Sequence, residues 1–291
     1  MSSQLISRVI DFKPDIIVNS TTWANQNFSY FTLNYIRSLG YVVLTVMWDT
    51  HVISMKHELD LFGSSDFFVI ADSVTNYAKY RLAAEMLGQH EKVLFLGGSQ
   101  VLSSIFRPVP GDKHYDVLIP GSQQGRRIQL TNFLFQRFEG SHYRIATKGG
   151  LVDSRSGLRP HDGLSAEWID WEHYVFEINL AEMVIVSQTE EDRSQIKGKL
   201  FECLACGVLV LAERVFDLSV LIPNDCIVFY DNLDDLYQKI VYYSENKKVA
   251  NIISENGRRW FLDNFNAEDY CVPIRLTQTP TRASGPRHGG H

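Results

Sequence analysis

Short apolar runs alternate with longer segments of helical periodicity along almost the whole chain. Parallel neighbouring strands need a long crossover connection, which is usually a helix, so this alternation predicts an α/β protein with helices on the faces of parallel sheets. The predicted strands span residues 15–19, 41–48, 67–71, 93–96, 115–120, 143–147, 183–187, 208–212 and 226–230. The predicted helices include 4–12, 27–38, 75–87, 130–138 and 233–241, the last with Asn232 as its cap.

The chain is long enough for two domains of ordinary size, since it has 291 residues. Residues 106–112 hold two prolines and a glycine beside charged residues, a composition typical of a linker. We therefore expect one domain at 1–107 and a second at 108–272. Residues 273–291 lack an apolar pattern and are rich in Thr, Pro, Gly, Arg and His, which predicts a disordered tail.

Composition and charge argue against several classes of protein. Apolar residues make up 45% of the chain and charged residues 21%, which is ordinary for a globular protein. A formal net charge of -6 argues against a nucleic-acid groove as the main function. No apolar stretch is long enough for a membrane span, and the first ten residues do not form a secretory signal. With four cysteines, the chain is expected in a reducing compartment, the cytoplasm.

Residues 199–211 carry a compact pattern of charged, small and apolar residues. The pattern predicts a short amphipathic helix that ends at Gly207, followed by a buried strand. Lys199 and Glu202 lie three positions apart and so share one face of this helix. An amine and a carboxylate beside a helix N-terminus could hold a phosphate and a sugar hydroxyl. A solvated salt bridge on an ordinary helix would give the same pattern.

The loop after the strand at 115–120 is a second candidate site. It contains Gly121 and Ser122, and the helix that follows begins with Arg126 and Arg127. Basic residues in a first turn oppose the helix macrodipole, so these arginines are expected to face an anionic partner. Free backbone N–H groups and a guanidinium together form a phosphate cradle. The alternative is a solvated pair of arginines.

These pieces, in their order and spacing, resemble the glycosyltransferases of the GT-B architecture, group 1 type, and among them the branch named after spore maturation proteins. The resemblance covers residues 16–270 and implies two facing Rossmann-like domains, of which the first is shortened at its N-terminus. It rests on Lys13-Pro14-Asp15, Trp48-Asp49, Tyr115-Asp116-Val117, Gly121-Ser122, Arg127, the segment from Phe201-Glu202 to Gly207, Tyr230-Asp231-Asn232, and Ile253 to Gly257 with a helix beyond it.

The resemblance implies that a nucleotide-diphosphate sugar binds mainly to the second domain. Glu202 would hold the ribose hydroxyls, while Arg127 and either Lys197 or Lys199 would hold the diphosphate. Enzymes of this architecture need no metal and no cofactor, and no Asp-x-Asp stands at a strand end here. The resemblance also implies transfer with retention to the hydroxyl of an unknown acceptor, which is a glycan, lipid, protein or small molecule.

Two positions depart from the family pattern. The second glutamate that often lies eight residues before Glu202 is replaced by Ser194. Relatives also usually open with a strand–helix unit that this chain lacks, so we expect that a further N-terminal segment or a partner chain completes the acceptor side.

Asp49 and His51 follow a predicted strand at the edge where open α/β sheets bind ligands. They are candidate catalytic residues that would contact the acceptor or the transferred sugar, although a loop histidine often has no such role. Two other functions stay open. A nucleotide-sugar epimerase of the same architecture would form product without an acceptor, and a noncatalytic nucleotide- or sugar-binding module would bind without turnover.

Overall fold

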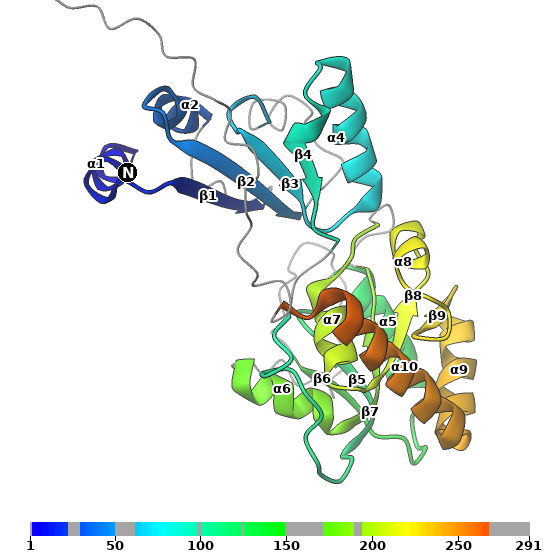
Figure 1. The fold of residues 1–291 in the computed structure, drawn as a ribbon. Helices are drawn as coiled ribbons and strands as arrows, with labels where there is room; N and C mark the ends of the chain where they lie inside the picture. The colour runs from blue at the N-terminus through cyan, green and yellow to red at the C-terminus, as the bar shows by residue number, and fades with distance from the viewer. Residues whose placement is uncertain are drawn as a thin grey trace, which may run out of the picture.

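The computed structural model describes residues 2–22, 30–49, 62–97, 101–123, 125–148, 171–188 and 194–267. These residues form two lobes, each built on its own parallel sheet (Figure 1). We call residues 2–97 the N-terminal lobe and residues 115–265 the C-terminal lobe. The predicted α/β class with parallel sheets is therefore confirmed. The predicted tail at 273–291 lies outside the described residues.

The N-terminal lobe contains a sheet whose four strands lie in the order in which they occur in the chain. All neighbouring strands are parallel. Leu33, Ile36 and Phe68 lie at the centre of its core and are fully buried. The elements are α1 (Ser2–Phe12), β1 (Ile16–Thr22), α2 (Tyr30–Ser38), β2 (Val42–Asp49), β3 (Phe67–Ile70), α4 (Val74–Met86), η1 (His90–Lys92) and β4 (Val93–Phe95).

The C-terminal lobe contains a sheet of five parallel strands in the order β6-β5-β7-β8-β9. The chain moves outward from β5 in both directions, so the strand order reverses between β5 and β7. In open α/β sheets, ligands bind outside the carboxyl ends of the strands at such a switch point. The strands are β5 (Tyr115–Pro120), β6 (Ile145–Lys148), β7 (Ala181–Val186), β8 (Leu209–Glu213) and β9 (Val228–Tyr230).

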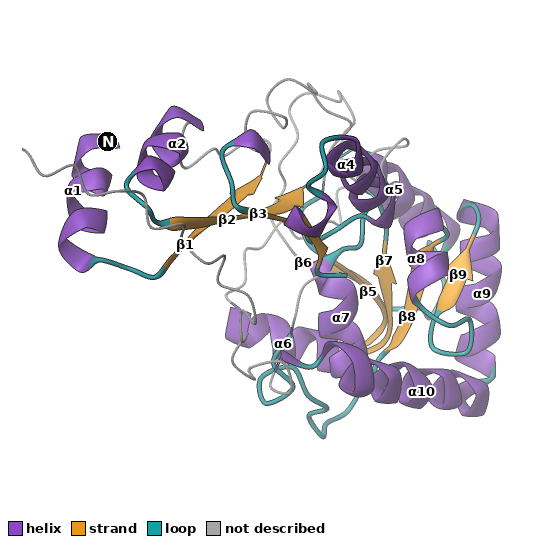
Figure 2. Ribbon diagram, turned by 45° about the horizontal axis from the view of Figure 1, so that its top comes forward, coloured by secondary structure: helices purple, strands orange, loops and turns teal. Residues whose placement is uncertain are grey.

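Helices cover both faces of this second sheet (Figure 2). Leu134 of α5 and Leu236 of α9 belong to the core on one face, whereas Ile178 of α6, Leu200 of α7 and Phe261 of α10 belong to the core on the other. The short helix α8 follows β8. The helices are α5 (Arg126–Arg137), α6 (Trp171–Asn179), α7 (Gly198–Ala205), α8 (Phe216–Leu221), α9 (Leu233–Glu245) and α10 (Lys247–Phe265).

Within the described residues, the chain passes from the N-terminal lobe to the C-terminal lobe once. Residues 102–114 contain no helix or strand, and they include the linker predicted at 106–112. At the end of α10 the backbone returns to the start of this connection, where the amide of Ala267 donates to the carbonyl of Val101 (3.0 Å). The domain boundaries at 107 and 108 stay a prediction.

Two glycines of the C-terminal lobe show where the sequence pattern was right and where it was wrong. Gly207 has φ +68° and follows α7, so the predicted glycine stop is confirmed. Gly257 was expected to precede a helix but lies inside α10, which continues through it. A side chain at Gly257 would collide with the carbonyl oxygen of Cys226 and would lie 2.8 Å from a methyl group of Leu204. Close packing explains this glycine.

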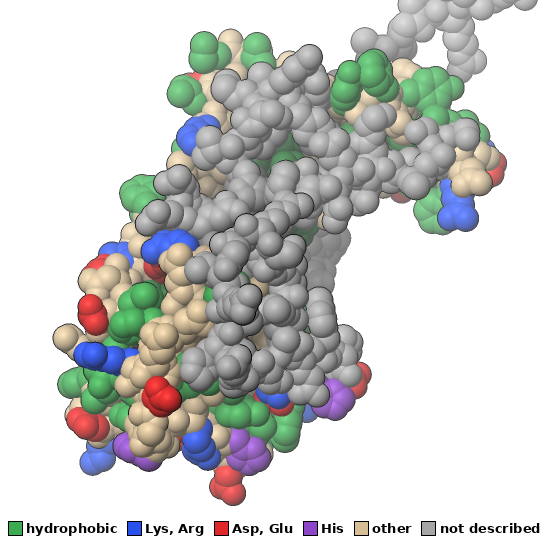
Figure 3. Space-filling model, turned by 180° about the vertical axis from the view of Figure 1, so that it is seen from behind, with side chains coloured by type: hydrophobic (Ala, Val, Ile, Leu, Met, Phe, Trp, Pro, Cys, Tyr) green, Lys and Arg blue, Asp and Glu red, His purple; other side chains and the backbone are tan. Residues whose placement is uncertain are grey.

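The surface of the C-terminal lobe mixes both signs of charge. Seen from behind, its described residues carry basic and acidic side chains near one another on this face, with apolar side chains between them (Figure 3). This view shows no extended basic patch on the described part of the face.

Candidate functional site

The turn after β5 lies at the switch point of the C-terminal sheet. Gly121 has φ +93°, which is a left-handed conformation that L side chains rarely adopt, and its amide donates to the carbonyl of Lys148 (2.6 Å). A side chain at this position would collide with Nζ of Lys199 and would lie 3.5 Å from Nη1 of Arg127. Glycine therefore allows two cations to approach the backbone of the turn. We call Gly121, Ser122, Arg127 and Lys199 the cradle.

Buried polar side chains hold the cradle turn in shape. The amide of Gln123 donates through Nε2 to the carbonyl of Gly121 (3.2 Å), and its Oε1 accepts from the hydroxyl of Thr131 (2.8 Å). Both Gln123 and Thr131 are buried. The turn is thus joined to α5 before any ligand binds.

Arg127 enters the cradle from the first turn of α5. Its guanidinium is buried and donates to the carbonyl of Ser122. It also donates to Oγ of Ser187 (3.4 Å) and to the carbonyl of Ser187 (3.4 Å). Burial lowers the pKa of Arg127. No Asp or Glu among the described residues forms an ion pair with it. A buried cation without a carboxylate is costly, so this position favours an anionic ligand.

Lys199 enters from the opposite side, at the start of α7. Its Nζ donates to the carbonyl of Pro120 at the end of β5 (2.9 Å). Burial, followed by the charges of Arg127 and Lys197, holds the pKa of Lys199 well below its usual range. Neither α5 nor α7 has an acidic residue in its first turn. Two helix N-termini and two cations therefore meet at one point, where negative charge is favoured.

Glu202 lies one turn further along α7. It forms a hydrogen bond with the hydroxyl of Tyr174 on α6. Burial raises the pKa of Glu202, while the bond from Tyr174 and the charge of Lys199 act in the opposite direction. The Tyr174 hydroxyl fixes one side of the carboxylate, which leaves further acceptor positions for other donors.

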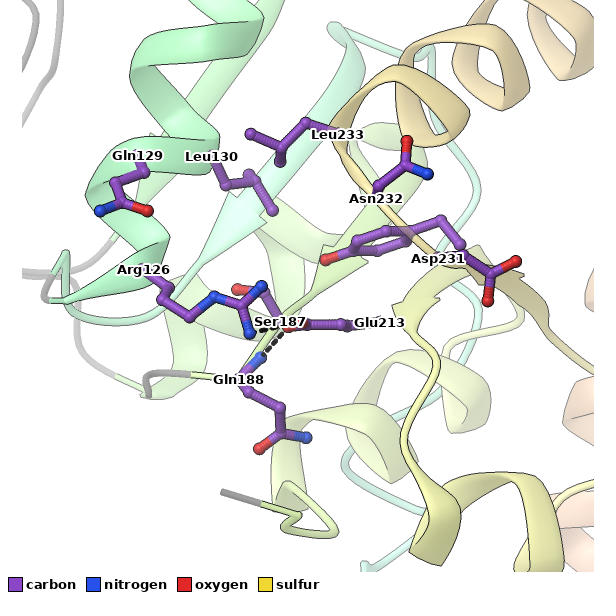
Figure 4. Close-up of a pocket in the computed structure, with 10 residues that line it drawn as sticks. Arg126, Gln129, Leu130, Ser187, Gln188, Glu213, Asp231, Asn232 and Leu233 are labelled. Atoms are coloured by element: carbon purple, nitrogen blue, oxygen red, sulfur yellow. Dashed lines mark hydrogen bonds and ion pairs between the residues drawn. The ribbon is translucent and has the colours of Figure 1, made fainter. Parts of the chain in front are cut away.

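The adjacent arginine does not share the partners of the cradle. The side chain of Arg126 extends to the end of β8, where Nη1 pairs with Glu213 (2.8 Å). The same carboxylate accepts from the backbone amide of Gln188 (3.0 Å) (Figure 4). These groups border a pocket of about 50 Å³. Its lining is Arg126, Gln129, Leu130, Ser187, Gln188, Glu213, Tyr230, Asp231, Asn232 and Leu233.

Of the remaining predicted residues, Lys197 lies close enough to the cradle for its charge to help lower the pKa of Lys199. Lys197 donates to the side chain of Gln195 in the segment before α7. Asp49 is the last residue of β2, and its backbone is paired with Thr22 of β1. His51 lies outside the described residues. The catalytic roles of Asp49 and His51 stay predictions.

The structure adds two residues that the sequence analysis did not select. Ser187 follows the central strand β7 and accepts twice from Arg127. Tyr174 positions the carboxylate of Glu202. A signal for Ser187 exists in the sequence, because it is the first polar residue after a buried strand. No comparable signal marks Tyr174.

A family model matches part of the C-terminal lobe, including Lys199 and Glu202 but not the Gly121 turn or Arg127. Residues 132–271 match the family model described as glycosyl transferase-like. No curated protein matches the sequence. The matched residues include most of the C-terminal lobe.

Solved structures share the fold over most of the chain. A glycosyltransferase from Rickettsia africae is 16% identical, with a TM-score of 0.64 over 92% of this chain and 76% of that one. HepE of Anabaena, solved with UDP and glucose, is 12% identical, with a TM-score of 0.67 over 92% and 78%. Sucrose-phosphate synthase of Thermosynechococcus elongatus is 14% identical, with a TM-score of 0.63 over 92% and 74%. The predicted GT-B fold class is confirmed.

Within the part of the chain that the structure describes, no helix is long and apolar enough to cross a membrane. The same residues contain no group of three or more His, Cys, Asp or Glu side chains that could hold a metal ion.

Proposed function

We infer that this protein is a glycosyltransferase that moves a sugar from a nucleotide-diphosphate sugar to an acceptor hydroxyl. The observation that carries the proposal is the cradle, in which the buried side chain of Arg127 and the partly buried side chain of Lys199 converge on the Gly121 turn. Among the described residues, no Asp or Glu forms an ion pair with either cation. A diphosphate supplies the missing negative charge. The branch of spore maturation proteins remains our preferred subgroup.

The cradle suits the charge that develops during transfer. Cleavage of the sugar–phosphate bond leaves negative charge on the diphosphate, and preorganised cations stabilise it where it forms. Arg127 and Lys199 would do this from two sides, with Gly121 and Ser122 allowing the backbone to approach. Glu202 would accept hydrogen bonds from the ribose hydroxyls.

We propose a retaining, metal-independent reaction. The acceptor oxygen attacks the anomeric carbon from the face that the diphosphate leaves, and the acceptor proton passes to a diphosphate oxygen. Asp49 and His51 are proposed to contact the acceptor or the transferred sugar. Buried free thiols at Cys203, Cys206 and Cys226 support a reducing compartment, so we propose that the reaction takes place in the cytoplasm.

A thermal-shift screen against nucleotide-diphosphate sugars, followed by a transfer assay, tests the proposal. A donor that binds only the folded state raises its stability, by about 3 kcal/mol at a hundred times its dissociation constant. Transfer to an added glycan or alcohol supports the enzyme. Tight binding without transfer or hydrolysis would favour a binding module, and conversion of the donor without any acceptor would favour an epimerase.

Glu202→Gln is expected to weaken UDP binding by about tenfold. The amide keeps the size of the side chain but replaces a charged acceptor, and hydrogen bonds to charged groups contribute about 1.5–3 kcal/mol. Titration calorimetry with UDP measures the effect. Glu255→Gln, on an exposed position of α10, is the matched control. Equal affinities in the two variants would remove Glu202 from the site.

UDP affinity is expected to fall as pH rises through the region below the ordinary lysine value of 10.5. In the free protein the pKa of Lys199 is lowered by burial, so the amine loses its proton at a lower pH than an ordinary lysine does. A bound diphosphate raises that pKa, and binding between the two values takes up a proton. Calorimetry in two buffers with different ionisation enthalpies measures this uptake. Lys199→Met should bind weakly and take up none, and the same uptake in wild type and variant would contradict the assignment.

A further inference from the structure

A fully buried carboxylate of the C-terminal lobe binds the start of a helix in the N-terminal lobe. Asp217 of α8 accepts hydrogen bonds from Oγ of Ser73 (2.9 Å), from Oγ1 of Thr75 (2.7 Å) and from the amide of Thr75 (3.2 Å). These donors belong to the cap and first turn of α4. The contact joins positions 144 residues apart.

The first turn of α4 depends on this carboxylate. The Ser73 hydroxyl caps the amide of Asn76 (3.1 Å), and α4 has no acidic residue in its own first turn. A helix N-terminus carries partial positive charge and leaves its first amides without intrahelical partners. Asp217 accepts from the amide of Thr75 and supplies negative charge to this helix N-terminus from the other lobe.

The segment that leads into α7 belongs to the same hydrogen-bonded network. The amide of Ile196 donates to the carbonyl of Asp72 (2.7 Å), and Nε2 of Gln195 donates to Oδ2 of Asp72 (2.7 Å). The amide of Asp217 donates to Oγ of Ser194 (3.4 Å). Ser194, where the family often has glutamate, thus joins α8 to the segment that precedes Lys199.

We propose that Asp217 is a positioning residue that couples nucleotide binding at the cradle to the contact between the two lobes. The proposal rests on the proposed function, because it takes the cradle as the nucleotide site. Asp217 contacts α4 and the 194–196 segment together, and α7 with Lys199 begins two residues after Ile196. A ligand that orders the start of α7 also orders the start of α4.

Hydrogen exchange of the full chain, with and without UDP, tests this coupling. In the wild type, UDP is expected to slow exchange at residues 198–205 and also at 72–77, about tenfold at each site when binding is saturated. In Asp217→Asn, protection at 198–205 should persist while protection at 72–77 is lost. Asp263→Asn, on an exposed position of α10, is the control and should behave as the wild type. Thr75→Val removes one donor to Asp217 without loss of volume and serves if Asp217→Asn does not fold.

The outcomes separate this proposal from the proposed function. If UDP protects 198–205 but not 72–77 in the wild type, or protects 72–77 equally in both proteins, the coupling is wrong while the nucleotide site stands. If UDP protects neither segment, the proposed function fails. Hydrogen exchange of the two proteins without UDP then tests whether Asp217 stabilises the hydrogen bond between Ile196 and Asp72. Exchange of the Ile196 amide about tenfold faster in Asp217→Asn supports it, and unchanged exchange overturns it.

Discussion

Lys199→Met is expected to slow sugar transfer by about 100- to 1,000-fold without destabilising the folded protein. The amine donates to the carbonyl of Pro120 and faces Arg127 across the turn, where the leaving diphosphate gains negative charge. Loss of one preorganised donor of this kind lowers the rate by about 100- to 1,000-fold. UDP affinity should fall by at least about tenfold, since a charged hydrogen bond is lost.

The free energy of unfolding of Lys199→Met is expected to stay equal or rise, although its activity falls. The pKa of Lys199 is held well below its usual range by burial, so the protonated amine is less favourable in the folded protein than in the unfolded chain. Methionine has a similar length and carries no charge. Replacing a buried charge by an apolar side chain of similar volume is often neutral or stabilising, by about 1 kcal/mol or more. The free energy of unfolding should therefore stay equal or rise.

Three measurements check this expectation on one protein. Calorimetry gives the UDP affinity, a donor-consumption assay gives the rate, and urea unfolding gives the stability. Lys248→Met changes an exposed lysine on α10 and should leave all three unchanged. A Lys199→Met variant that transfers sugar at the wild-type rate would remove Lys199 from the site. A variant that loses activity together with stability would indicate a structural role instead.

The two sheets could be predicted from the sequence because most strands consist largely of apolar residues. The strand at 115–120 agrees with β5 at both ends, and most others differ by one or two residues. Two helices were not predicted. The helix α8 has six residues, too few for a clear periodicity, and no helix was predicted at α6. The order of the strands in each sheet could not be predicted from the sequence, because it depends on how the crossover connections pack.

The sequence predicted which residues form the site, but not which groups their side chains contact. Arg126 and Arg127 are adjacent on α5, so their side chains point about 100° apart around the helix axis. The sequence could not tell which one turns inward. The structure gives Arg126 a carboxylate on β8, whereas the described partners of Arg127 are hydroxyl and carbonyl oxygens. The approach of Lys199 to Gly121 joins segments 78 residues apart, and no local pattern records it.

Gly257→Ala is expected to destabilise the protein, although alanine is the better helix former. In an exposed helix interior this change stabilises by about 1 kcal/mol. Here the added methyl group would collide with the carbonyl oxygen of Cys226 and would lie 2.8 Å from Leu204. The first neighbour is backbone and cannot rotate away. Overpacking of this kind costs about 1–3 kcal/mol, which outweighs the gain in helix propensity.

The same substitution is expected to weaken UDP binding from a distance. Leu204 belongs to α7, the helix that carries Lys199 and Glu202, and α10 packs on it. If α10 moves away to relieve the collision, the contacts that fix α7 against the Gly121 turn change as well. Urea unfolding should therefore show a lower stability, and calorimetry should show a lower affinity, in the same variant.

Gly63→Ala is the matched control, because a methyl group there meets no atom within 4 Å. Its stability should differ from that of the wild type by no more than about 0.5 kcal/mol, as is usual for surface changes. If Gly257→Ala raised stability as an exposed helical glycine does, α10 would not be packed against the Cys226 carbonyl. If it lowered stability but left UDP affinity unchanged, α7 would be held in place by the sheet rather than by α10.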